Sequence, residues 1–230
     1  PWRGYDQDFN TFTLNNAHVA ISTEYGGSEF TLELDFGSNA MMDSLLSTGT
    51  ADILSIQEAF IETELGSSFG LKMGKFATSV GVEVLEAPEN PVFTHGYLFN
   101  YAMPATHTGL LVTYEEDTLA FEAGIVNGWD SVVDNDNDPT FYANALVSGS
   151  GWDAMISFIK GTELTVERTL FDLSMTFKPT NDLEVKAEYL SGSQESGPTV
   201  KWSGIAMEAV FGRPGSVKFG VRYESFDDSD

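Results

Sequence analysis

The feature that most constrains this chain is the alternation of two kinds of connection between amphipathic segments. Short polar turns join the segments in pairs at residues 26–27, 66–68, 115–117, 149–151, 179–181 and 213–215. Long connections separate the pairs near residues 38–52, 77–107, 128–139, 161–167 and 192–200. Outer-membrane barrels sort their connections in this way, with short turns on one side of the membrane and long loops on the other. The alternation therefore predicts an all-β fold, an antiparallel up-and-down transmembrane β-barrel.

Period-two alternation of apolar and polar residues marks the strands. In residues 217–224, Val217, Phe219, Val221 and Tyr223 share one face, and charged or small residues share the other. Segments of about 9–11 residues have the length that a tilted membrane strand needs. The twelve expected strands are residues 12–25, 28–37, 53–65, 69–77, 108–115, 118–127, 140–148, 152–160, 168–178, 182–191, 201–211 and 216–226.

We expect residues 1–230 to form a single outer-membrane β-barrel domain. If the short turns are periplasmic, the first expected strand runs toward the periplasm and the last runs outward. Bacterial barrels have an even number of strands, and their chains normally begin and end in the periplasm. The parity predicts one further strand before residue 1 and another after residue 230, which makes 14 in the intact protein.

Composition leaves the membrane and the soluble readings open. Soluble sandwiches show the same half-buried alternation, and the chain contains 42% hydrophobic residues without a continuous apolar run long enough for a membrane helix. Aromatic residues near strand ends favour lipid, because barrels carry aromatic girdles there. Cysteine is absent, which excludes disulfides. The net charge of −24 argues against nucleic-acid binding. An acidic charge of this size is also expected of a protein with solvated loops or one adapted to a salty medium.

The polar faces of the strands are expected to line a wet lumen. Acidic residues predominate there, and acidic rings favour cations in pores. The expected pore-lining residues are Glu33, Asp35, Glu58, Glu62, Glu64, Lys72, Glu122, Arg168, Asp172, Glu184, Lys186, Glu188, Lys218, Arg222 and Glu224.

The long connection at residues 77–107 is unusually apolar for a surface loop. We expect it to fold into the lumen or across its mouth as a pore constriction. Phe93, Tyr97 and Phe99 would anchor it, since burying each ring is worth about 1.5–3 kcal/mol. An extracellular cap over the mouth is the alternative.

Short motifs in this region add a family resemblance. Their order and spacing resemble the OmpL-like β-barrel porins, the second β-barrel porin family of Gram-negative bacteria. The motifs are Gly74-Lys75-Phe76, Glu89-Asn90-Pro91, Tyr97-Leu98-Phe99, Pro104-Ala105-Thr106-His107-Thr108-Gly109 and Asn127-Gly128-Trp129-Asp130. The resemblance implies a passive pore in the bacterial outer membrane, without catalytic residues and with an unnamed solute.

No motif predicts a metal site, a cofactor or catalysis. The acidic run at residues 134–138 resembles the start of a calcium loop, but Pro139 and Ala145 stand where an EF-hand needs Gly and Glu. The histidines are His18, His95 and His107, outside any hydrolase motif. A motif search does not detect catalytic partners that lie on different strands. For His18, however, a role as a polar residue facing the lumen is a sufficient explanation.

The sequence thus favours a porin for passive diffusion of small hydrophilic solutes or ions, with modest cation preference. Its expected partners are outer-membrane lipid, lipopolysaccharide and the solutes. The alternative is a plugged structural or adhesive surface barrel without transport. A soluble β-protein of a salt-loving organism is the third reading. The solute and the oligomeric state stay open.

Overall fold

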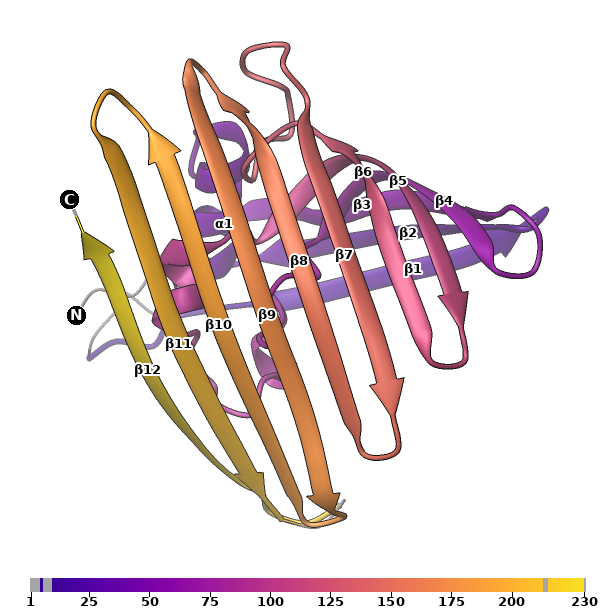
Figure 1. The fold of residues 1–230 in the computed structure, drawn as a ribbon, viewed down its shortest axis with the longest axis vertical. Coiled ribbons are helices and arrows are strands. Elements are labelled where there is room, and N and C mark those ends of the chain that lie inside the picture. Colours follow the sequence, from indigo (N-terminus) through magenta and orange to yellow (C-terminus); the bar gives the residue numbers. More distant parts are fainter. Residues whose placement is uncertain (1–4, 6–9, 213–214, 230) are drawn as a thin grey trace.

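The strands form one antiparallel sheet in which each pairs with its neighbours in the chain, from β1 to β12 (Figure 1). The computed structural model describes residue 5, residues 10–212 and residues 215–229. The strands are β1 (Ala17–Tyr25), β2 (Ser28–Phe36), β3 (Leu54–Glu64), β4 (Phe69–Ala77), β5 (Thr106–Glu116), β6 (Leu119–Val126), β7 (Thr140–Gly149), β8 (Trp152–Glu163), β9 (Val166–Thr180), β10 (Leu183–Glu195), β11 (Thr199–Phe211) and β12 (Phe219–Ser229). The expected all-β, up-and-down fold with twelve strands in this chain is confirmed.

The alternation of residue types along each strand separates two faces of the sheet. On β8, Ile156 and Phe158 are exposed, whereas Ser157 and Ile159 are buried. Strands β9, β10 and β11 repeat this alternation of buried and exposed residues. Exposed apolar side chains such as Leu173, Tyr189 and Ile205 give the outer face a wide apolar band. A soluble monomer rarely exposes so large an apolar surface, and the outward apolar band of a membrane barrel has this character.

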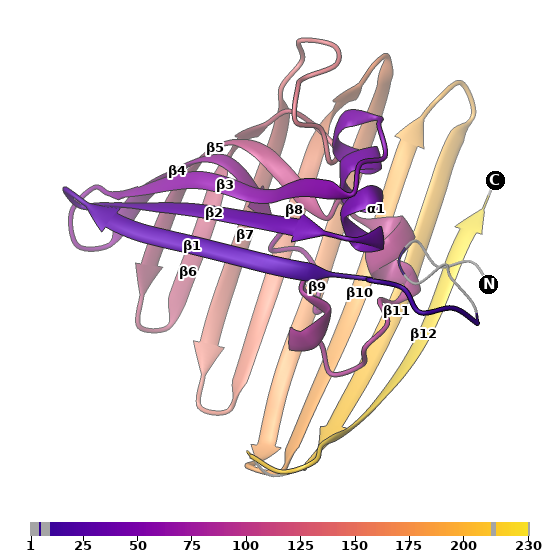
Figure 2. The ribbon, with the colours of Figure 1, turned by 180° about the vertical axis from the view of Figure 1, so that it is seen from behind.

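The sheet is strongly bent, so that β1–β4 lie across the inner side of β7–β12 (Figure 2). A helix and the connection between β4 and β5 lie in the space between the two walls (Figure 2). Within the described ranges β1 and β12 lie at opposite ends of the strand order and do not pair. The expectation of 14 strands in the intact protein stays a prediction.

The prediction of long connections near residues 161–167 and 192–200 is wrong. Strand β8 passes into β9 through residues 164–165, and β10 passes into β11 through residues 196–198. The ladders continue to the pairs Glu163↔Val166 and Glu195↔Thr199. Leu164 adopts a left-handed conformation (φ 62°), which permits the tight turn. Short turns and long connections therefore alternate strictly only in the first half of the chain.

The expected polar loop at residues 38–52 contains a helix instead. Helix α1 (Ser38–Thr48) ends at Gly49, whose left-handed conformation (φ 75°) directs its N–H to the carbonyl of Leu45. The helix packs mainly against β3 and buries Ala40 and Asp43. Across the described part of the chain, no helix is long and apolar enough to cross a membrane.

Candidate functional site

The connection between β4 and β5, residues 78–105, lies on the inner face of the sheet and is called here the inner segment (Figure 2). It contains a 3-10 turn, η1 (Ala87–Glu89), and a π-helical turn, η2 (Leu98–Ala102). The turn η2 packs against β10 and β11. The segment therefore occupies the space that a barrel of this kind encloses.

The aromatic residues of the inner segment have different environments. Phe99 is 3% exposed and belongs to the core cluster, with the His95 ring stacked on it at 4.1 Å between centroids. Phe93 is 67% exposed and Tyr97 52% exposed. The expectation that Phe93, Tyr97 and Phe99 anchor the segment is therefore corrected: of the three, Phe99 alone is buried. At Tyr97 the anchor is the backbone N–H, which donates to Glu224, and not the ring.

Carboxylates on β9 and β10 bind the backbone at the start of the inner segment. Asp172 accepts a hydrogen bond from the N–H of Gly81 at 3.3 Å, and Glu188 accepts one from the N–H of Val82 at 3.1 Å. Lys186 Nζ donates to the carbonyl oxygen of Val82 at 3.1 Å. Side chains of β10 therefore bind both backbone groups of Val82.

A second group of charges on β11 and β12 binds the middle of the segment. Glu224 accepts hydrogen bonds from the N–H groups of Tyr97 at 3.0 Å and Leu98 at 3.3 Å, at the N-terminal end of η2. The Arg222 guanidinium pairs with Glu83 and lies 3.4 Å from a Glu224 oxygen. Burial raises the pKa of Glu83 to about 7, although the Gly96 N–H and Arg222 oppose this shift.

The end of the segment is held by a residue outside the strands. Asp130 accepts hydrogen bonds from the N–H groups of Ala105 at 2.8 Å and Thr106 at 2.9 Å. Burial raises the pKa of Asp130 to about 6, against the lowering effect of these two bonds. The Trp202 indole donates to the carbonyl oxygen of Ala102 at 2.9 Å. The inner segment is therefore held at its start, in its middle and at its end.

Several residues predicted to line a pore thus contact the inner segment. Glu58 belongs to the same set, since it accepts a hydrogen bond from the N–H of Ala77 beside the start of the segment. Their part in lining a pore stays a prediction. Glu122 belongs to the set too, since it accepts a hydrogen bond from Ser79 Oγ at 2.6 Å. The set is Glu58, Glu122, Asp172, Lys186, Glu188, Arg222 and Glu224.

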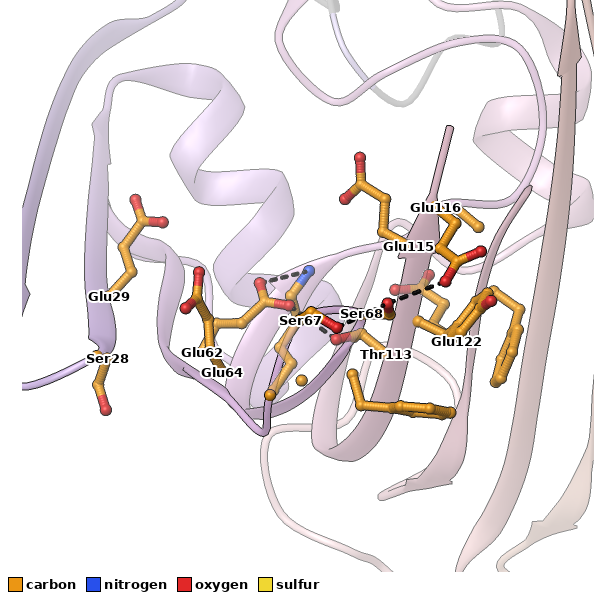
Figure 3. A pocket seen from close by; sticks show the side chains of 18 of the residues that line it. Ser28, Glu29, Glu62, Glu64, Ser67, Ser68, Thr113, Glu115, Glu116 and Glu122 are labelled. Carbon is orange, nitrogen blue, oxygen red and sulfur yellow. Dashed lines mark hydrogen bonds and ion pairs between the residues drawn. The ribbon is translucent and has the colours of Figure 1, made fainter. Parts of the chain in front are cut away.

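A cavity of about 1080 Å³ lies at the short-turn ends of β1–β6 and is called here the acidic cavity (Figure 3). Among the described residues that line it, eight are acidic and one is basic, Lys72. The acidic residues are Glu24, Glu29, Glu62, Glu64, Glu115, Glu116, Asp117 and Glu122.

The acidic cavity offers few basic partners to its carboxylates, although hydroxyl groups donate hydrogen bonds to Glu62, Glu116 and Glu122. Lys72 Nζ lies 3.8 Å from a Glu62 oxygen, which is a loose ion pair. Glu24, Glu29 and Glu62 stand directly opposite one another on β1, β2 and β3. Like charges at opposed positions destabilise a sheet, so this row of carboxylates costs stability and gives the cavity a negative potential.

A second cavity of about 820 Å³ lies nearer the long-connection ends of β1–β3, between these strands and the inner segment. Glu33 and Glu58 line it, together with His18. The His18 ring lies 2.7 Å from an Asp35 oxygen, and Asp35 is buried beneath it. Three of these residues were predicted to line a pore: Glu33, Asp35 and Glu58.

The remaining predicted residues lie apart from both cavities. Arg168 donates to Gln194 and stacks over the Trp129 ring at 4.8 Å. Glu184 pairs with Lys178 at 3.1 Å, and Lys218 precedes β12 at an exposed position.

Sequence reasoning missed several carboxylates of the acidic cavity. Glu115, Glu116 and Asp117 lie at a hairpin tip, for which the sequence pattern predicts only a turn. Glu29 lies on the inward face that was already recognised from Glu33. Counting acidic residues at the hairpin tips as well as on the strands was the signal available for finding them.

The fold and a family are both recognisable by comparison. A sequence model of the family described as "Putative beta-barrel porin-2, OmpL-like" matches residues 4–230. A search of curated proteins finds no match.

Solved structures with a similar fold are outer-membrane proteins. One is a loop-deletion mutant of OmpT, an outer membrane protein of Vibrio cholerae, with 13% identity and a TM-score of 0.62, over 92% of this chain and 72% of that one. Another is an anion-selective porin from Comamonas acidovorans, with 10% identity and a TM-score of 0.63, over 95% and 70% of the two chains. At such identities the likeness is one of fold alone.

Proposed function

Because the chain belongs to the OmpL-like β-barrel porin family, we propose that it lets small hydrophilic solutes and ions diffuse passively, with a modest preference for cations. The protein is an outer-membrane β-barrel porin and resides among the lipids of the bacterial outer membrane. Diffusion down a gradient needs neither a catalytic group nor a cofactor, so the proposal assigns none.

The proposed path runs between the inner segment and the wall formed by β1–β6. The inner segment is held against β9–β12 by the hydrogen bonds of Asp172, Glu188 and Glu224. Both cavities lie on the other side of it, and they share strand β3, which contributes Glu58 to one and Glu62 to the other. Solutes would pass from the second cavity to the acidic cavity along this wall.

The acidic lining of the cavity at the short-turn ends is the observation that carries the cation preference. Rings of carboxylates favour cations in pores, and a negative cleft concentrates counter-ions. The Debye length falls from about 10 Å at 0.1 M salt to about 3 Å at 1 M. The preference is therefore expected to be modest and to weaken as salt rises.

Replacing carboxylates of the acidic cavity tests this proposal. The variant Glu24→Gln, Glu29→Gln, Glu64→Gln should shift the reversal potential toward zero in a planar bilayer with a low-salt KCl gradient. The matched control is Asp138→Asn, Glu195→Gln, Asp227→Asn, which removes three charges outside the cavity lining. Equal shifts in the two triple variants would mean that overall charge, and not this cavity, sets the preference.

A plugged barrel is the second candidate, and the firm attachment of the inner segment favours it. The segment is bound at its start by Glu188, in its middle by Glu224 and at its end by Asp130. Absence of any KCl conductance from correctly folded, reconstituted protein would support this structural or adhesive role over diffusion.

A further inference from the structure

The cavity of about 820 Å³ between β1–β3 and the inner segment has the size of a site for a small organic molecule. This is the second cavity described above, lined by Glu33, Glu58 and His18, and it is called here the upper cavity. Its lining combines carboxylates, amides, the exposed ring of Phe93 and the imidazoles of His18 and His95, without a lysine or arginine among the described residues. This combination narrows the class of molecule that fits.

Carboxylates reach the upper cavity from three parts of the chain: Glu33 on β2, Glu58 on β3, and Glu86 and Glu89 in the inner segment. Gln57, a neutral group, donates to Glu86, and His18 lies 3.8 Å from a Glu33 oxygen, so a protonated His18 would offset only part of the charge of these carboxylates. Burial raises the pKa of Glu86, and the charges of Glu58 and Glu89 raise it further. A bound cation would relieve this repulsion.

His95 lines the same cavity and is 5% exposed. Neither of its ring nitrogens makes a hydrogen bond of ordinary geometry, although the Leu85 backbone lies near enough to favour the protonated ring slightly. Burial lowers the pKa of His95 to about 4, so the ring is neutral at pH 7. A buried polar group without a partner costs stability, and a neutral imidazole nitrogen can accept a hydrogen bond from an ammonium group.

Phe93 supplies an apolar contact on the rim of the upper cavity. Its ring is 67% exposed although it lies inside the bent sheet. Ala87 and Pro88 continue the apolar lining. Aromatic faces attract both hydrocarbon and cations, which suits a molecule that carries a positive charge on an apolar body.

We infer that the upper cavity is a binding subsite for organic cations, in which a primary ammonium group lies among Glu33, Glu86 and Glu89 and an apolar body contacts Phe93. The inference rests on the proposed function, since it names a solute class for the same path. Bound molecules would hold the segment between Glu86 and His95 against β1–β3. Their release toward the acidic cavity is favoured by the carboxylates that line it.

Calorimetry in detergent micelles and current recording in planar bilayers test the subsite together. The probe is 2-phenylethylammonium, and 2-phenylethanol is its neutral counterpart of nearly equal size. We expect the ammonium compound to bind at least about tenfold more tightly than the alcohol and to interrupt the KCl current. Equal affinity for the two compounds would overturn the inference.

Variants locate the binding. Glu86→Gln, Glu89→Gln should weaken binding of the ammonium compound about tenfold, and Phe93→Ala, at an exposed ring, should weaken both compounds severalfold. The matched control Asp138→Asn, Glu195→Gln removes two charges outside the linings of both cavities and should leave the affinity within about twofold. An affinity unchanged by both upper-cavity variants would overturn the subsite.

The two proposals fail in different ways. A protein that conducts KCl but binds neither compound, or binds both alike, is a porin without this subsite. A protein that binds 2-phenylethylammonium in micelles but conducts no KCl retains the subsite and loses the proposed diffusion.

Discussion

At the scale of single residues, Arg222 is the group that balances most charge around the inner segment. It pairs with Glu83, lies 3.4 Å from Glu224 and lies 3.8 Å from the fully buried Glu208. Removing one partner of a buried ion pair costs about 3–5 kcal/mol, because the other charge is left uncompensated. We expect Arg222→Met to lower the free energy of unfolding by that amount.

Chemical denaturation in detergent at pH 7 measures this loss. Lys218→Met is the matched control, because Lys218 is exposed and precedes the same strand. Adding Glu208→Gln to Arg222→Met should restore part of the stability. A loss below about 1 kcal/mol in Arg222→Met would show that the cluster does not hold the segment electrostatically.

A second residue-scale prediction concerns Asp43 on α1. Burial raises its pKa to about 7, and the charge of Asp35 adds to this, while the hydrogen bond from Tyr5 Oη at 2.5 Å opposes it. A carboxyl with a higher pKa in the folded protein stabilises the fold below its unfolded pKa. That stability is lost as the pH rises through the folded value. Its contribution should therefore decline between about pH 4 and pH 8.

Thermal unfolding of Asp43→Asn checks this direction. Asparagine retains an acceptor for Tyr5 and has no charge to bury, so the variant should melt higher than the parent at pH 8. The difference should be much smaller at pH 4.5. A difference between variant and parent that does not change with pH would contradict the assignment.

At the scale of elements, the turn η2 of the inner segment packs against β11, with Leu98 next to Gly204. A Cβ at Gly204 would overlap Leu98 Cδ2 and lie 2.9 Å from the carbonyl oxygen of Ser225. The variant Gly204→Leu should therefore displace η2 and increase single-channel conductance, as should deletion of residues 86–103. The control Ala209→Val lies on the outer face of the same strand and should leave conductance unchanged.

Unchanged conductance in both the Gly204→Leu and the deletion variant would place the inner segment outside the ion path. In that case the proposed path between the inner segment and β1–β6 would be wrong.

The strands were predictable from sequence because their two faces meet different environments. The polar residues on alternate positions of β10, such as Glu184 and Glu188, needed no knowledge of distant contacts. Helix α1 was missed because its buried face is short and partly polar, with Asp43 and Ser44 beside Ala40. The tight turn at Leu164 was missed because a left-handed leucine has no sequence signature.

At the scale of the whole molecule, the site was less predictable than the sheet. Alternation identifies a carboxylate as inward-facing, but its partner can be a backbone group far along the chain. Glu224 binds the N–H of Tyr97, which is 127 residues away. The sequence therefore predicted inward charges such as Glu62 and Glu224 alike, without separating those that line a cavity from those that hold the inner segment.

The same distinction explains how a strongly acidic chain would form a path with only modest selectivity. Part of its inward charge is bound to the inner segment, as with Asp172 and Glu188. The acidic cavity retains carboxylates that have few partners, among them Glu24 and Glu29. Selectivity is then expected to depend on one end of the barrel.

The reversal potential of the unmodified protein in a planar bilayer tests the central claim most directly. With KCl at about 0.1 M on one side and about 1 M on the other, K⁺ should be preferred over Cl⁻. The preference should be larger when both solutions are diluted tenfold, because screening weakens as the salt concentration falls. Open channels whose reversal potential shows a preference for K⁺ agree with a path lined by the acidic cavity. A potential of the opposite sign, or no conductance from folded protein, would contradict it.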